Sequence, residues 1–164
     1  MFREMRRFKQ QLSAADAREI LEKGSCGVLA CAGDDGYPYA VPLSYVLDGQ
    51  TIYFHSAMQG HKIDALRGCD KVSFCVVAQD QVVPAELTTY YASAIAFGRA
   101  RFVEDAAEKR AALMKFGLKY EPGMDAHVLE HVEQSFSRTA LIAIDIEHLT
   151  GKEAIELTRQ RGKT

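Results

Sequence analysis

The chain has 164 residues, of which 48% are hydrophobic and 26% charged, and its 20 Lys and Arg residues nearly balance 22 Asp and Glu residues. This length and composition fit one folded domain over residues 1–164 and exclude a disordered or fibrous chain. A formal net charge of -2 excludes a general binder of nucleic-acid backbones, so we expect any phosphate to be recognised locally.

The amino-terminal residues 1–8 alternate charged and apolar side chains and lack the apolar stretch of a secretory signal. The longest apolar runs, at 72–78 and 141–144, have the length of strands, so no membrane span is expected and a cytoplasmic location is predicted. The cysteines form no CxxC pair and are expected to be reduced. They are Cys26, Cys31, Cys69 and Cys75.

The first predicted helix covers residues 13–23, with Ser13 as its N-cap. Three strands follow at 26–32, 37–47 and 50–56, separated by Gly- and Asp-rich turns that are typical of hairpins. We expect these three strands to form an antiparallel meander.

The rest of the chain alternates between strand-like and helical patterns. The predicted elements are a helix at 60–67, a strand at 71–78, a loop at 79–88, a strand at 89–103, helices at 105–119 and 125–134, and a strand at 139–146. A basic tail from about residue 152 is expected to be solvated. Six antiparallel strands with peripheral helices predict an α+β chain, mainly β, folded as a small closed or split barrel.

The segment 53–62 joins the end of a strand to the start of a helix and contains residue types that bind phosphate. These residues are Ser56, Gly60, His61 and Lys62. Free backbone N–H groups and the positive end of a helix meet at such a junction, and a hydroxyl, a backbone exposed by Gly and a Lys charge would complete an anion site. An ordinary Ser/Gly turn with a solvated Lys would have the same pattern. The residues alone leave both interpretations open.

The preceding strand contains Pro38 and Pro42, which predict an edge or bulged strand with unpaired backbone groups. A planar heteroaromatic ring with hydrogen-bonding edges would suit that backbone and the flanking Tyr45. A contact between two subunits would suit it as well.

Two other patterns in the sequence, a zinc-type motif and a group of aromatic residues, have simpler interpretations. His127 and His131 belong to an H-x-x-E-H pattern, the motif of inverted zinc peptidases, but those enzymes need a further acidic ligand well downstream and only 33 residues follow His131. We expect a solvated or dimer-facing helix there and no metal. Tyr90, Tyr91 and Phe97 lie in a strand and are expected to contact the core or a cofactor, not nucleic-acid bases.

Taken together, these motifs resemble the nitroimidazole reductase-like branch of the pyridoxamine 5'-phosphate oxidase-like superfamily of FMN-binding split barrels. The resemblance covers nearly the whole chain, and the combination of motifs is specific although each one alone is weak. The matching segments are 27–30, Pro38, 41–45, 52–57, 60–62, 72–74, 91–98 and 146–152.

The resemblance implies a six-stranded antiparallel split barrel that works as a homodimer with FMN at the interface. It implies that the third strand and the following helix hold the FMN phosphate, that the second strand lines the isoalloxazine ring, and that the fifth strand of the other subunit contributes. The implied cofactor-binding residues are Pro42, Leu43, Ser44, Tyr45, His55, Ser56, Ala57, Gly60, His61, Lys62, Tyr91 and Ser93.

The implied function is an FMN-dependent oxidoreductase that reduces a small nitroaromatic acceptor with electrons from NAD(P)H, through hydride chemistry at the flavin N5. The alternative is a non-catalytic protein of the same fold that stores or senses flavin, or that binds haem or a deazaflavin. No catalytic residue is assigned, because His55 fits a binding or tuning role better than an acid/base role. The arginine-rich pattern of vitamin B6 oxidation is missing, since Arg67 alone does not supply it.

Overall fold

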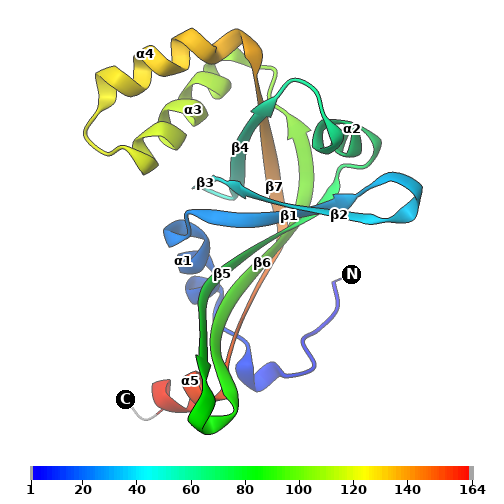
Figure 1. Cartoon of the computed structure of the whole chain (residues 1–164), viewed down its shortest axis with the longest axis vertical. Coiled ribbons are helices and arrows are strands. Elements are labelled where there is room, and N and C mark those ends of the chain that lie inside the picture. The colour runs from blue at the N-terminus through cyan, green and yellow to red at the C-terminus, as the bar shows by residue number, and fades with distance from the viewer. Residues whose placement is uncertain (1, 163–164) are drawn as a thin grey trace.

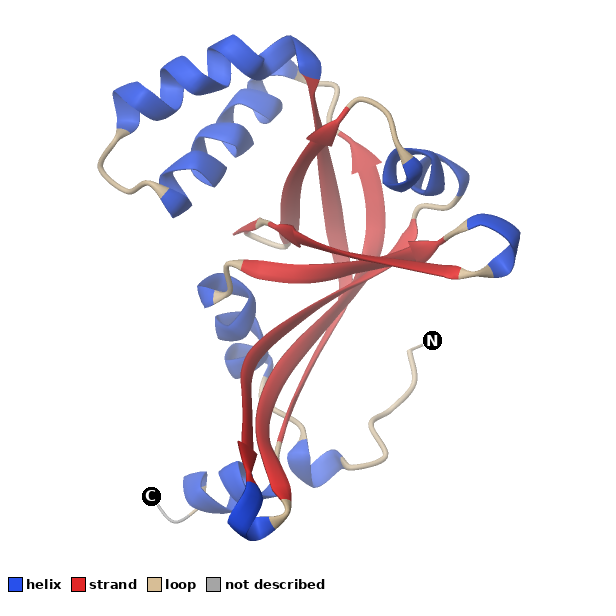
Figure 2. Ribbon diagram, viewed as in Figure 1, coloured by secondary structure: helices blue, strands red, loops and turns tan. Residues whose placement is uncertain are grey.

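The computed structural model describes residues 2–162, which form one seven-stranded antiparallel sheet and five α-helices (Figures 1 and 2). The strands are β1 Cys26–Ala32, β2 Pro38–Ser44, β3 Val46–Asp48, β4 Thr51–Ala57, β5 Lys71–Val83, β6 Thr88–Phe102 and β7 Thr139–Glu153. The helices are α1 Ala14–Lys23, α2 His61–Gly68, α3 Ala106–Tyr120, α4 Asp125–Ser135 and α5 Ile155–Arg161. The strand order is β2-β1-β5-β6-β7-β4-β3.

The predicted strand at 37–47 is two strands, so the sheet has seven strands and not six. β2 pairs with β1, β3 pairs with β4, and these two pairs lie at opposite ends of the strand order although Tyr45 alone separates β2 from β3. The sheet therefore curls until its ends meet at Tyr45, as a split barrel requires. The two expected antiparallel hairpins are confirmed, but the break at Tyr45 places them at opposite ends of the strand order and not side by side as three adjacent strands.

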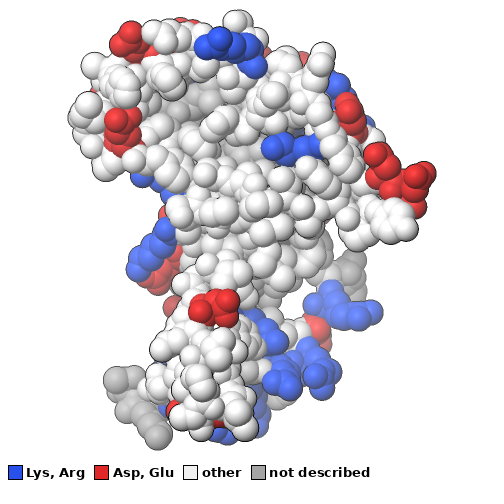
Figure 3. All heavy atoms as spheres, viewed as in Figure 1, with Lys and Arg blue, Asp and Glu red and all other residues white. Residues whose placement is uncertain are grey.

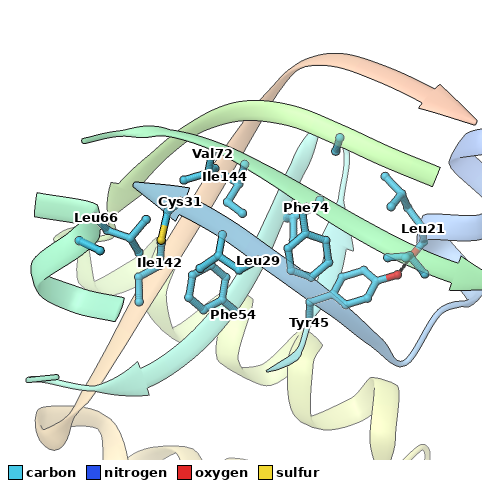
Figure 4. Close-up of a cluster of buried hydrophobic side chains, with 14 of the residues drawn as sticks. Leu21, Leu29, Cys31, Tyr45, Phe54, Leu66, Val72, Phe74, Ile142 and Ile144 are labelled. Atoms are coloured by element: carbon cyan, nitrogen blue, oxygen red, sulfur yellow. Dashed lines mark hydrogen bonds between the residues drawn. The ribbon is translucent and has the colours of Figure 1, made fainter. Parts of the chain in front are cut away.

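Tyr45 breaks the strand because its polar groups bond to helices and not to a neighbouring strand. Its side chain is fully buried, and its hydroxyl donates to the Leu21 carbonyl at 2.6 Å (Figure 4). Its backbone N–H donates to the Tyr120 hydroxyl at 3.1 Å. Burial raises the pKa of the Tyr45 phenol, so the hydroxyl stays protonated as that bond requires.

The second difference from the expected fold is a projecting arm, defined here as residues 77–92 of β5 and β6 with the end of β7 beside them (Figure 1). The predicted loop at 79–88 is wrong, because β5 runs to Val83, β6 begins at Thr88, and only a short 3-10 turn separates them. Likewise, β7 runs to Glu153, and α5 takes the place of the expected solvated tail.

The remaining elements agree with their predictions to within a few residues. α1 begins after Ser13, whose side chain accepts a hydrogen bond from the Asp16 backbone N–H at 3.1 Å, as expected of an N-cap. The predicted helix at 60–67 is α2, and the helices at 105–119 and 125–134 are α3 and α4.

Two groups of buried side chains hold these elements. The main core lies inside the curled sheet, where Leu29, Phe54 and Phe74 are fully buried (Figure 4). Burying each such side chain stabilises the fold by about 1.5–3 kcal/mol. A second cluster packs the α3–α4 hairpin onto β4 and β7 through Val128, Leu141 and others. Within residues 2–162, no helix combines the length and apolar character needed to cross a membrane.

Candidate functional site

The junction between β4 and α2 is shaped by strand alternation and by one glycine. Along β4, Phe54 points into the core, His55 is exposed, Ser56 is half-buried and Ala57 is exposed at the strand end. Gly60 precedes α2 with φ +127°, a conformation that side chains rarely adopt. The sequence thus ends the strand and starts a helix within a few residues.

The N-terminus of α2 is open. No side chain caps its first turn, which leaves the first backbone N–H groups available to an anion. Lys62 lies in this turn, half-buried, with its Nζ 5.8 Å from the centre of the Phe54 ring. Burial lowers the pKa of Lys62, and within residues 2–162 neither a carboxylate nor another oxygen pairs with its Nζ.

Two contacts hold the ring of His61 away from the open N-terminus of α2. Its ring stacks on Tyr39 of β2 with the centroids 4.1 Å apart, and its Nε2 lies 3.5 Å from Asp34 Oδ2. His61 therefore offers its backbone N–H to the junction, while its ring connects α2 to β2. This contact places two segments that the sequence singled out separately next to each other.

β2 presents its residues in strict alternation. Pro42 and Ser44 are exposed, whereas Leu43 packs against the main core. The side chains of Leu43 and Tyr45 point inward, as the period of the strand dictates, so only their backbone would face a ring beside β2. Their assignment to the cofactor stays a prediction. Backbone groups of β2 remain accessible to a ring along one edge of the strand, because β2 ends the strand order and that edge has no strand partner within residues 2–162.

His55 faces the α3–α4 hairpin. Its ring lies edge-on to Phe116 with the centroids 4.6 Å apart. Partial desolvation, and then the charge of Lys62, lower the pKa of His55, so the imidazole is largely neutral at pH 7. With Ser44 it lines a cavity of about 550 Å³ between the barrel and the hairpin.

Tyr91 and Ser93 are not brought to the junction within one chain. Both lie on β6 where it continues into the arm, and Lys152 Nζ stands 5.4 Å from the centre of the Tyr91 ring. In Figure 1 this part of β6 lies at the opposite end of the molecule from α2. Their participation through a second subunit stays a prediction.

Residues of the α3–α4 hairpin were missed as site residues. Phe116, Tyr120, Glu121, His127 and His131 line the cavity beside His55 and Ser44. The hairpin closes because Gly117 lets it pack tightly: a Cβ at this position would stand 2.3 Å from Val128 Cγ1. The H-x-x-E-H spacing was the one signal in the sequence, and it predicted only that the two histidines share a face.

Charged side chains of residues 2–162 form no continuous patch over the barrel on the visible face of the molecule (Figure 3). On the face shown in Figure 3, uncharged surface dominates the barrel, and basic and acidic groups are scattered around it. On this face (Figure 3), no extended basic surface of the described residues covers the region of the β4–α2 junction.

The family model for pyridoxamine 5'-phosphate oxidase matches residues 13–153. The chain belongs to this family. The matched range runs from the N-cap of α1 to the end of β7 and so includes the β4–α2 junction, β2 and the hairpin. This confirms the resemblance read from the sequence at the level of the family.

Solved structures with the same fold include a FAD-binding protein of Mesorhizobium loti, 28% identical over 88% of this chain and 97% of that chain, with a TM-score of 0.62. A candidate 5-nitroimidazole antibiotic resistance protein of Bacteroides thetaiotaomicron is 22% identical over 87% of this chain and 86% of that chain, with a TM-score of 0.73. A FAD- and heme-binding protein of Mycobacterium smegmatis is 22% identical over 94% of this chain and 80% of that chain, with a TM-score of 0.77. At 22% identity, the last two show the fold alone.

One curated relative, an uncharacterized protein of Rhizobium meliloti, is 38% identical over 66 residues. This match covers 40% of the present chain and spans 42% of the length of that relative.

Proposed function

We propose that this chain is an FMN-binding oxidoreductase of the pyridoxamine 5'-phosphate oxidase family that reduces a small nitroaromatic-type acceptor. One observation carries the proposal: a half-buried Lys62, paired with no oxygen of residues 2–162, stands at the uncapped N-terminus of α2. Burial lowers the pKa of this half-buried ammonium, so its charged form is partly desolvated, and an anion bound there would stabilise the charge.

The residues at the junction fit a phosphate group. Lys62 would supply charge, Ser56 a hydroxyl, and the first turn of α2 its backbone N–H groups. A Cβ built on Gly60 would meet no atom within 4 Å, so the space next to this backbone is open. These features favour the phosphate interpretation over an ordinary solvated turn.

The exposed residues Pro42 and Ser44 and the free edge of β2 would support and orient the flavin ring. A bound flavin supplies hydride transfer, while the protein supplies position and electrostatics. The neutral His55 avoids placing a second full charge beside Lys62. The α3–α4 hairpin would limit the access of water from the side of the cavity.

We propose a homodimer as the working form because, within residues 2–162, part of one face of the sheet is apolar and exposed. A line of facing residues crosses four strands on this face, from Pro42 through Val28 and Cys75 to Ile95. Val28 and the nearby Val77 are 38% and 59% exposed, which is the pattern of a sheet face that another surface covers. A second copy would also bring Tyr91 and Ser93 toward the flavin.

The first test is the visible absorption spectrum of the purified protein, followed by chromatographic identification of the compound that heat denaturation releases. We expect FMN, and light scattering should give twice the chain mass of 18.2 kDa. Release of FAD would change the assigned cofactor, while a haem spectrum or an inert flavoprotein would favour the non-catalytic alternative.

A double variant tests the assigned residues. Ser56→Ala with Lys62→Ala should weaken FMN binding by about tenfold or more, because a charge-assisted hydrogen bond contributes about 1.5–3 kcal/mol. The matched control is Lys9→Ala with Ser137→Ala, which changes the same residue types at exposed positions outside the junction. Full FMN affinity in the first variant would contradict the assignment.

A further inference from the structure

The cavity between the barrel and the α3–α4 hairpin has a composition that the flavin site does not explain. Its volume of about 550 Å³ lies within the range of about 300–1,000 Å³ that is typical of small-molecule sites. Its wall combines aromatic rings with imidazoles over an apolar floor. The residues that matter here are His55, Phe116, Tyr120, Glu121, His127 and His131.

The aromatic side of the cavity is fixed in place. Phe116 and Tyr120 lie on one face of α3, with their ring centroids 5.1 Å apart. The Tyr120 hydroxyl is bound outside the cavity, where it donates to the Ser25 carbonyl at 2.6 Å. Rings held in this way offer a preformed surface to a planar aromatic ligand.

The opposite side carries two histidines on adjacent turns of α4. His127 Nδ1 lies 3.0 Å from Glu121 Oε2, so the carboxylate orients this imidazole and leaves Nε2 for a ligand. The His131 ring follows at a centroid distance of 6.1 Å, as expected of positions i and i+4 on one helix face. Glu121 is the one carboxylate in the cavity lining, and it is already engaged with His127.

We interpret the H-x-x-E-H spacing as placing two hydrogen-bonding imidazoles on one helix face, and not as a set of zinc ligands. Within residues 2–162, no three His, Cys, Asp or Glu side chains are grouped as metal ligands. The two imidazoles instead place hydrogen-bonding nitrogens beside an aromatic wall. Such a site matches a planar ring that carries an oxygen-rich acidic group.

The cavity also adjoins the proposed flavin site, because Ser44 and His55 belong to both. We propose that the cavity binds the electron acceptor as a one-ring aromatic acid. The ring lies against Phe116 and Tyr120, the acid group contacts His127 and His131, and the reducible end faces His55. This inference rests on the proposed function, whose acceptor it defines more closely.

The test uses 4-nitrobenzoate as the probe and 4-nitrobenzamide as its uncharged control. Each is titrated into histidine-labelled protein, with and without FMN, and the imidazole NMR signals are followed. The chain has five histidines, so His61 and His148, which lie outside the cavity lining, serve as internal controls. We expect 4-nitrobenzoate to shift the signals of His55, His127 and His131 alone, and the amide to bind about tenfold more weakly.

Variants give an independent readout. His127→Ala and His131→Ala should each weaken 4-nitrobenzoate binding by about tenfold and leave FMN affinity unchanged. His148→Ala, which removes a ring that stacks on Phe2, should change neither. Both cavity histidines are exposed on α4, and an unchanged melting temperature would show that the variants fold.

Three results would overturn the inference: equal binding of acid and amide, signal shifts confined to His61 or His148, or loss of FMN in His127→Ala. The last would assign the cavity to the flavin itself. If the protein refuses FMN while 4-nitrobenzoate still shifts the three cavity histidines, the proposed function fails and the cavity stands as a site for an aromatic acid. The two failures are therefore distinguishable.

Discussion

Two half-buried lysines mark the difference between a structural region of the molecule and the proposed binding region. Lys119, at the end of α3, donates to the carbonyls of Gly24 and Tyr45 at 2.5 and 3.0 Å and lies 4.2 Å from the centre of the Tyr45 ring. Lys62, at the start of α2, also lies near an aromatic ring but pairs with no oxygen in the part of the chain that the structure describes.

Burial lowers the pKa of both lysines, so desolvation does not distinguish them. What differs is the set of hydrogen-bond acceptors. The Lys119 ammonium donates hydrogen bonds to two backbone carbonyls of the fold. These bonds lie at the seam, defined here as the point around Tyr45 where the two ends of the sheet meet. The Lys62 ammonium is left for a partner from outside. A buried cation therefore indicates a binding site only when the fold does not satisfy it.

The largest effect is expected at the seam itself. Tyr45→Ala should reduce the free energy of unfolding by about 3–5 kcal/mol, because it removes a fully buried aromatic side chain. It also leaves the Leu21 carbonyl without its donor. Urea denaturation followed by far-UV circular dichroism measures the change. A loss below about 1 kcal/mol would mean that the seam does not hold the two sheet ends together.

An effect of intermediate size is expected when the unfolding free energies of variants at the two lysines are compared. Lys119→Met should cost about 1–3 kcal/mol of unfolding free energy, because two carbonyls lose their donor. The matched Lys62→Met should leave the cofactor-free protein as stable as before or slightly more stable, since it removes an unsatisfied charge. Urea titrations of both variants without cofactor make the comparison. Equal losses would remove the distinction on which the phosphate site depends.

The same contrast explains what the sequence could predict. The proposed phosphate junction is local, since Ser56, Gly60 and Lys62 lie within seven positions of the chain. A strand end followed by glycine and a helix can be recognised without tertiary information. The seam is not local, because Tyr45 depends on Leu21 and on Tyr120, which is 75 positions away. One strand was therefore expected where the fold has two.

The arm and the cavity escaped prediction for related reasons. β5 continues past a register shift between Val77 and Gln79 into a stretch that is largely exposed, so no hydrophobic alternation marks it as a strand. The cavity depends on tertiary packing: Gly117 permits the close approach of α3 and α4, and His55 and His127 come from distant parts of the chain to line it. Residue spacing placed His127 and His131 on one face but did not show which surface that face meets.

The smallest effect concerns protonation near Lys62. The Lys62 charge contributes to lowering the pKa of His55, so Lys62→Met should raise that pKa toward its ordinary value, whereas Lys119→Met should not move it. NMR titration of the His55 ring in the cofactor-free proteins measures both shifts.

The lowered pKa of His55 also determines how this residue changes the stability of the fold with pH. Because the folded-state pKa of His55 lies below the unfolded value of about 6.5, the unfolded chain binds the proton more readily between these two values. The contribution of His55 to stability is therefore complete above pH 6.5 and declines as the pH falls toward the folded-state pKa. Lys62→Met should narrow this acid-sensitive window, because it brings the folded-state pKa of His55 closer to the unfolded value while desolvation still lowers it. An unchanged His55 titration in Lys62→Met would mean that the Lys62 charge does not reach the cavity, and the phosphate and acceptor sites would then be electrostatically independent.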